Sequence, residues 1–187
     1  MRIADILPDP DRWSRHVITV DAAPGRTVEA ACAVTPGEIR LFRPLMVARA
    51  LPALVAGRRV SMDSDEPVLD LAARVGFRRL VDERTEVVIA HAGRYWRPGG
   101  GLHRGFASLD EFLAFDEPGW VKLAAGFHAF AGNGGGSQLV TETRVRATNA
   151  AARTAFGAYW LMINRPAGWI RNGWLRAARR RAESGPA

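Results

Sequence analysis

The chain has 187 residues, 48% hydrophobic and 24% charged, with a formal net charge of +7. This composition is typical of a globular protein, and the length predicts one domain over residues 1–187. The one cysteine, Cys32, excludes an internal disulfide and a cysteine-rich metal site, and we expect it to be a small buried side chain. Because arginines and prolines interrupt the longest apolar stretch, residues 41–55, no transmembrane segment is expected. With no signal peptide recognised after Met1, a cytoplasmic location is expected.

The positive charge is concentrated at the end of the chain. Residues 141–187 hold nine arginines and two glutamates, and nine minus two accounts for the whole +7. A basic helix of this kind can meet nucleic acid or an anionic membrane surface. We favour solvated arginines that complement a helix dipole, because no nucleic-acid motif accompanies them. Nucleic acid is therefore not an expected partner, whereas peripheral membrane contact stays open.

The first part of the chain predicts one strand and short helices. Residues 1–12 contain two prolines and are expected to form an arm laid over the surface. Residues 13–20 alternate in polarity, which predicts a strand, and residues 26–34 favour a short helix. Residues 42–57 predict two short helices or one bent helix, because they contain two prolines. The polar residues 58–67 predict a loop.

The middle of the chain returns to strands. Residues 77–81 predict a strand, and residues 86–96 predict another that is central in its sheet, since both of its faces are mostly apolar. The glycine-rich residues 97–101 predict a flexible connection. Residues 106–115 fit one helical turn or an edge strand, and the pattern does not decide between them.

The last part predicts two long strands followed by a long helix. Residues 120–131 and 137–147 are the strands, and the glycines between them predict a hairpin turn rather than a phosphate-binding loop, because no helix follows the turn directly. A helix is expected over residues 149–183, interrupted near Pro166. Its apolar stripe is Ala152, Phe156, Tyr159, Trp160 and Ile163. We expect the strands 86–96, 120–131 and 137–147 to be adjacent and antiparallel, with this stripe on their concave face.

Two stretches carry a resemblance to a known family. They are residues 17–30 (VITVDAAPGRTVEA) and a set near the end of the chain, residues 141–145, 155–160, 168–171 and 175–183. Here the chain resembles the START-like, helix-grip superfamily, also called the SRPBCC or polyketide cyclase and lipid-transport group, in a bacterial branch. The resemblance implies an α+β fold in which a curved antiparallel β-sheet wraps around a long C-terminal helix. It also implies a cavity for an apolar or aromatic small molecule, and no catalytic residue.

Three residues are candidates for acid–base chemistry. His91 and His128 lie on expected strands, where the pair could shuttle a proton or polarise a carbonyl, although we favour hydrogen-bonded structural histidines. No third ligand at short spacing accompanies them, so no metal is expected. Glu142 either pairs with Arg144, which we favour, or points into the cavity as a base. Catalytic residues are therefore left unassigned, and no cofactor is expected.

Strand alternation and the helix stripe together predict a largely apolar pocket with one or two polar groups that orient a ligand. Its expected lining is Ile89, His91, Tyr95, Phe127, Thr141, Thr143, Phe156 and Trp160. Three functions stay open. The leading one is binding of an apolar or aromatic small molecule for transport or sensing. The others are a cyclase- or dehydratase-like enzyme and an interaction protein that docks through its arginine-rich last helix.

Overall fold

The computed structural model describes residues 3–47, 65–97, 103–132 and 134–184. Its centre is a curved, unclosed antiparallel sheet of six strands in the order β1-β6-β5-β3-β2, with β4 also paired to β3. The strands are β1 Arg12–Val20, β2 Arg78–Glu83, β3 Glu86–Gly93, β4 His103–Arg104, β5 Val121–Ala131 and β6 Ser137–Ala147. The predicted α+β class and curved antiparallel sheet are confirmed.

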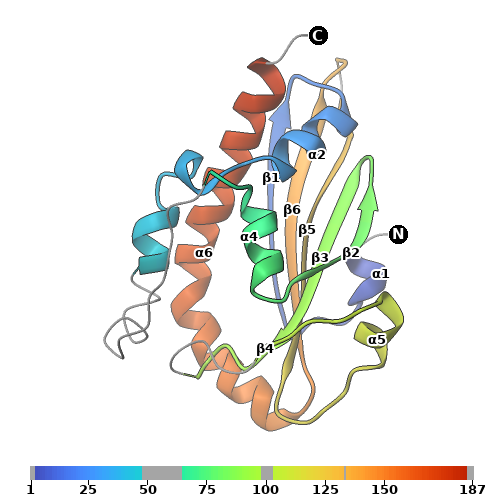
Figure 1. Ribbon diagram of the computed structural model, residues 1–187, viewed down its shortest axis with the longest axis vertical. Helices are drawn as coiled ribbons and strands as arrows, with labels where there is room; N and C mark the ends of the chain where they lie inside the picture. The colour runs from blue at the N-terminus through green and yellow to red at the C-terminus, as the bar shows by residue number, and fades with distance from the viewer. Residues whose placement is uncertain (1–2, 48–64, 98–102, 133, 185–187) are drawn as a thin grey trace.

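Helices cover both faces of the sheet. They are α1 Ile3–Ile6, α2 Pro24–Cys32, the 3-10 helix η1 Pro36–Glu38, α4 Val68–Arg74, α5 Leu109–Ala114 and α6 Ala150–Ser184. Residues 42–47 are also helical. The long helix α6 runs along the concave face with α2 and α4, whereas α1 and α5 lie on the opposite, convex face (Figure 1). The core is therefore divided into a concave side and a convex side by the sheet.

The three predicted adjacent strands are confirmed as β3, β5 and β6. Antiparallel pairing places Ala125 opposite Ile89 on one side and opposite Thr143 on the other. Every residue of β3 is buried, because helices pack on both of its faces, which agrees with its predicted central position. The strand predicted at 77–81 begins at Arg78 and extends to Glu83.

The turn between β5 and β6 depends on glycine. Gly134 and Gly135 have φ angles of +89° and +93°, a region that other residues rarely adopt. The amide of Gly132 donates to the carbonyl of Gly136 at 2.9 Å and closes the turn. The prediction of a hairpin turn is confirmed.

The helix α6 begins where the sequence predicts. The side chain of Asn149 accepts a hydrogen bond from the amide of Ala152 at 2.9 Å, which is an N-terminal cap. The predicted interruption near Pro166 is wrong, since the helix continues through it to Ser184. Proline removes one hydrogen bond, to the carbonyl of Met162. Met162 is among the most exposed apolar residues, so water can bond that carbonyl, and packing on either side of Pro166 holds the helix together.

The predicted apolar stripe of α6 packs on the concave face, as expected. Its members Phe156, Tyr159, Trp160 and Ile163 contact a cluster of sheet and loop residues. These partners are Tyr95, Val121, Val145 and Ala147. Because α6 does not break, the stripe continues through Ala167, Ile170 and Trp174 toward the other end of the sheet.

The N-terminal residues do more than lie over the surface. Ile3, Ile6 and Leu7 are buried in the convex core, and the amide of Ile3 donates to the Glu86 carboxylate at 3.1 Å. The guanidinium of Arg144 donates to the carbonyl of Leu7 at 3.1 Å and fixes the arm. The predicted arm is thus corrected to a short helix that fills a cluster, because Ile3, Ile6 and Leu7 have helical spacing and the two prolines follow the helix.

Two further segments complete the comparison with the sequence. Residues 106–115 contain the helix α5, which settles the alternative between helix and edge strand. The helix α4 was not predicted. The expectations for residues 48–57, 58–64 and 98–101 lie outside the described residues.

Replacing Trp160 by alanine should strongly destabilise the fold. Trp160 is 9% exposed and its ring centroid lies 5.8 Å from that of Phe156. Truncation of a buried aromatic side chain costs about 3 to 5 kcal/mol of unfolding free energy. Urea denaturation checks this value, with Trp169→Ala as the control, since Trp169 on the same helix is 56% exposed. Equal midpoints for the two variants would contradict the packing described here.

Candidate functional site

A pocket of about 210 Å³ lies between α6, α4 and the concave face of the sheet. Its lining is predominantly apolar and comes from five strands or helices (α4, β3, β5, β6 and α6) and one connecting residue, Phe77. The lining residues are Leu69, Phe77, Val87, Ile89, Leu123, Ala125, Gly126, Phe127, Thr141, Ala167, Ile170, Arg171 and Trp174. Such a combination of apolar walls and few polar groups is typical of small-molecule sites.

The strand register and the helical repeat place these residues together. On α6, the residues 167, 170, 171 and 174 are spaced by about one turn and therefore share one face. On the sheet, Phe127 lies opposite Thr141, so both side chains point toward the helix. The rings of Phe127 and Trp174 lie 4.9 Å apart, and the indole N–H of Trp174 donates to the carbonyl of Ala31 at 2.8 Å. This hydrogen bond fixes the orientation of the Trp174 ring in the wall.

The polar part of the wall centres on Arg171. Its guanidinium donates to the Thr141 hydroxyl at 3.3 Å. Burial lowers the pKa of Arg171 to about 10, so the side chain remains protonated at neutral pH. Among the described residues, no aspartate or glutamate pairs with Arg171. The pocket therefore contains a positive charge whose one described hydrogen bond is to a neutral hydroxyl.

His16 lies beside this group. It is opposite Thr141 in the register of β1 and β6, and its Nδ1 is 3.2 Å from the Asn172 side-chain amide. Burial, and then the charge of Arg171, lower the pKa of His16 from its ordinary value of 6.5. His16 is consequently neutral at pH 7, and Arg171 carries the charge at this end of the pocket.

The structure brings together three of the eight predicted lining residues: Ile89, Phe127 and Thr141. Thr143 is buried on the same face of β6, but it does not line the pocket. The other predicted members belong to the neighbouring cluster around the first half of α6, where Phe156 lies 6.3 Å from Tyr95 and 5.8 Å from Trp160. That part of the prediction is wrong, because these rings fill the space between helix and sheet.

His91 lies between the pocket and this aromatic cluster. Its ring stacks on Phe77, a pocket residue, at 4.5 Å, and its Nδ1 is 2.7 Å from the Tyr95 hydroxyl. The residue is 0% exposed, and burial, followed by the proximity of His103, lowers its pKa to about 4. The favoured interpretation as a structural histidine agrees with this environment, because His91 is neutral and separated from the pocket by a ring.

The proposed histidine pair and the Glu142 base are wrong. His128 alternates with the pocket residue Phe127 on β5 and faces the convex side, away from His91. Glu142 alternates with Thr141 and also faces the convex side. There its Oε1 lies 2.5 Å from Arg144 Nε and 2.9 Å from the indole nitrogen of Trp13. The favoured pairing of Glu142 with Arg144 is therefore correct.

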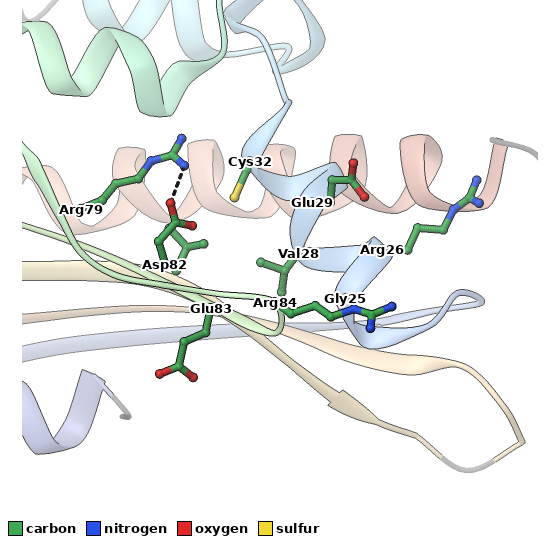
Figure 2. A pocket seen from close by; sticks show the side chains of 10 residues that line it. Gly25, Arg26, Val28, Glu29, Cys32, Arg79, Asp82, Glu83 and Arg84 are labelled. Carbon is green, nitrogen blue, oxygen red and sulfur yellow. Dashed lines mark hydrogen bonds and ion pairs between the residues drawn. The ribbon is translucent and has the colours of Figure 1, made fainter.

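A second hollow, of about 430 Å³, lies between α2 and the strands β2 and β3 (Figure 2). Its rim carries charges of both signs, and Arg79 and Asp82 form an ion pair at 3.3 Å. Cys32 lies here half-buried, and burial raises the pKa of its thiol to about 11. A thiol that stays protonated is a poor nucleophile, so this hollow offers neither reactive cysteine nor apolar walls.

Sequence reasoning missed several pocket residues. The interruption predicted near Pro166 leaves Ile170 and Trp174 outside the predicted apolar stripe, although both line the pocket. Arg171 was counted only toward the net charge. The signal that could have found it is its position one residue after Ile170 and three before Trp174, which places it on an apolar helix face.

Comparison with known proteins does not assign a family. No family model matches the chain, and neither a curated protein nor a solved structure does. Within the described residues, no helix is both long and apolar enough to cross a membrane. The same residues contain no group of three or more His, Cys, Asp or Glu side chains placed to hold a metal ion.

Acidification should destabilise the wild-type protein more than a His91→Gln variant. In the unfolded chain His91 has a pKa near 6.5, and in the fold it is about 4, so the unfolded state binds more protons between these values. Neutral His91 contributes its full stability above pH 6.5 and loses it as the pH falls toward 4. The loss is at most about 3 kcal/mol. Urea unfolding at several pH values measures it, and identical pH slopes in both proteins would contradict it.

Two matched substitutions on β6 should have opposite effects. The buried hydroxyl of Thr143 has no hydrogen-bond partner in the described part of the chain, so Thr143→Val should leave stability unchanged or raise it by about 1 kcal/mol. Thr141→Val removes the acceptor of the Arg171 hydrogen bond and should cost about 1 to 2 kcal/mol. Chemical denaturation compares the two. A larger loss for Thr143→Val would reveal a partner for its hydroxyl.

Proposed function

We propose that this protein binds an apolar or aromatic small molecule, for transport or sensing, in the pocket between α6 and the concave face. The observation that carries the proposal is the apolar pocket of about 210 Å³ with a single polar group cluster at Thr141 and Arg171. The pocket opens to solvent and exposes apolar side chains to water, so a ligand that covers its walls removes an unfavourable contact. Apolar walls favour an apolar ligand body through the hydrophobic effect.

The volume limits the size of the ligand. An engineered apolar cavity of about 150 Å³ is large enough to bind benzene. The present pocket, at about 210 Å³, fits one ring with a substituent, two fused rings or a short aliphatic chain. Four fused rings exceed this volume, so sterols and large polyketides are poorer candidates than small aromatic molecules.

The long helix on a curved sheet also supports the proposed place of the chain in the START-like superfamily, whose resemblance implies a cavity in this position. The cyclase- or dehydratase-like alternative has less support. His91, His128 and Glu142, its expected acid–base residues, do not line the pocket.

The interaction-protein alternative rests on the outward face of α6. Leu161, Met162 and Trp169 are exposed there, and Arg165 lies among them in the sequence. Apolar and basic residues on one helix face are found in proteins that lie on anionic membranes. Nothing in the described structure indicates what covers this face, and small-molecule binding therefore remains the proposed function.

Filling the pocket should weaken binding at least about tenfold without unfolding the protein. Ala167 lines the pocket from α6, and Ala167→Phe places a ring in the empty volume. Isothermal titration calorimetry with indole and 2-naphthamide should detect binding to the wild-type protein and at least a tenfold weaker binding, roughly 1.4 kcal/mol, to this variant. Ala158→Phe is the control, because Ala158 lies on the same helix and is exposed. Unchanged binding by Ala167→Phe would place the ligand elsewhere.

A further inference from the structure

We infer that the ligand is a small carboxylic acid, whose carboxylate binds the guanidinium of Arg171 beside Thr141 while its apolar body fills the pocket. This inference rests on the proposed function and specifies the chemical class of the ligand.

The first argument is the position of the charge. Arg171 belongs to the lining of the pocket, on the helix face that also carries Ile170 and Trp174. Its guanidinium reaches across to β6, where its described hydrogen bond is to the Thr141 hydroxyl at 3.3 Å. A guanidinium has five N–H donors, so several remain available to a ligand in the pocket.

The second argument is the missing counter-charge. Two other arginines of α6 and β6 that pack against the fold pair with carboxylates, Arg144 with Glu142 and Arg181 with Glu38. In the described part of the chain Arg171 has no carboxylate partner, and its described hydrogen bond is to the Thr141 hydroxyl. Burial lowers its pKa. Arg171 is partly buried, and a cation that has lost part of its hydration gains from a paired anion, so an anion that enters the pocket gains a favourable interaction with it.

The third argument selects a monoanionic carboxylate. Arg171 supplies one positive charge, and His16, the neighbouring titratable group, has a lowered pKa and is neutral at pH 7. A carboxylate matches this single charge and the planar fork of the guanidinium, whereas a phosphate dianion would leave one charge uncompensated. Because the Thr141 oxygen accepts the bond from Arg171, its own O–H can donate to the second carboxylate oxygen.

The walls determine the rest of the ligand. Facing the polar group are Ile89, Phe127 and Trp174, and Phe127 and Trp174 have ring centroids 4.9 Å apart. Aromatic walls favour a flat ligand that packs on their faces or edges. An aryl carboxylic acid of one or two rings therefore satisfies the volume, the charge and the shape of the pocket together.

The test compares 2-naphthoate with its neutral isostere 2-naphthamide by calorimetry at neutral pH. The wild-type protein should bind the carboxylate at least about tenfold more tightly than the amide. Arg171→Met should lose this preference and retain amide binding. Arg176→Met should behave as wild type, because Arg176 is an exposed arginine on the same helix, and the variant makes the same change in net charge.

The outcomes separate the inference from the proposed function. Amide binding without a carboxylate preference, or a preference that survives in Arg171→Met, overturns the inference and leaves small-molecule binding standing. Binding of neither compound overturns both. If Arg171→Met does not fold, carbon-13 NMR of carboxyl-labelled 2-naphthoate bound to wild type decides: the carboxyl pKa falls beside Arg171 and rises if the group lies in an apolar environment.

Discussion

The contact between α6 and the concave face of the sheet is the interaction on which the rest of the structure depends. One helix face supplies Phe156 and Trp160 to an aromatic cluster and, further along, Ile170 and Trp174 to the pocket. The difference between these two regions is side-chain volume and shape. Where large rings from helix and sheet meet, the space is filled. Where small residues such as Ala167 on the helix and Ala125 on the sheet line the interface, a pocket remains open.

The sequence predicts the layers of this fold well, because each layer has its own periodicity. Alternation in residues 86–96, 120–131 and 137–147 identifies three adjacent strands and the sides on which Phe127 and Thr141 lie. The pocket was placed too near the start of α6, since Pro166 was expected to end the stripe. Local propensity predicts a break there, and tertiary packing, which the sequence alone does not display, keeps the helix intact.

The sequence gives the number of arginines on α6 but not the direction in which each side chain points. Arg171 and Arg176 are the same residue type on the same helix, yet Arg171 faces the pocket and Arg176 faces solvent. Only their positions around the helix distinguish them, and these positions follow from the continuous helix Ala150–Ser184. Two of the acid–base candidates do not reach the pocket for a similar geometrical reason. His128 and Glu142 are each one residue away from a pocket residue on their strands, so their side chains point to the convex face.

The order of the strands also affects how the chain acquires its fold. The first strand, β1, pairs along its length with β6, which lies at the far end of the chain, and α6 follows β6. During synthesis, β1 and α2 therefore emerge long before β6 and α6, and the part of the concave face that α6 covers stays exposed until this last helix is made. Such non-local pairing slows folding and leaves apolar surface exposed to other chains. A ligand that binds between helix and sheet would stabilise the last step of this assembly, because the pocket does not exist until α6 docks.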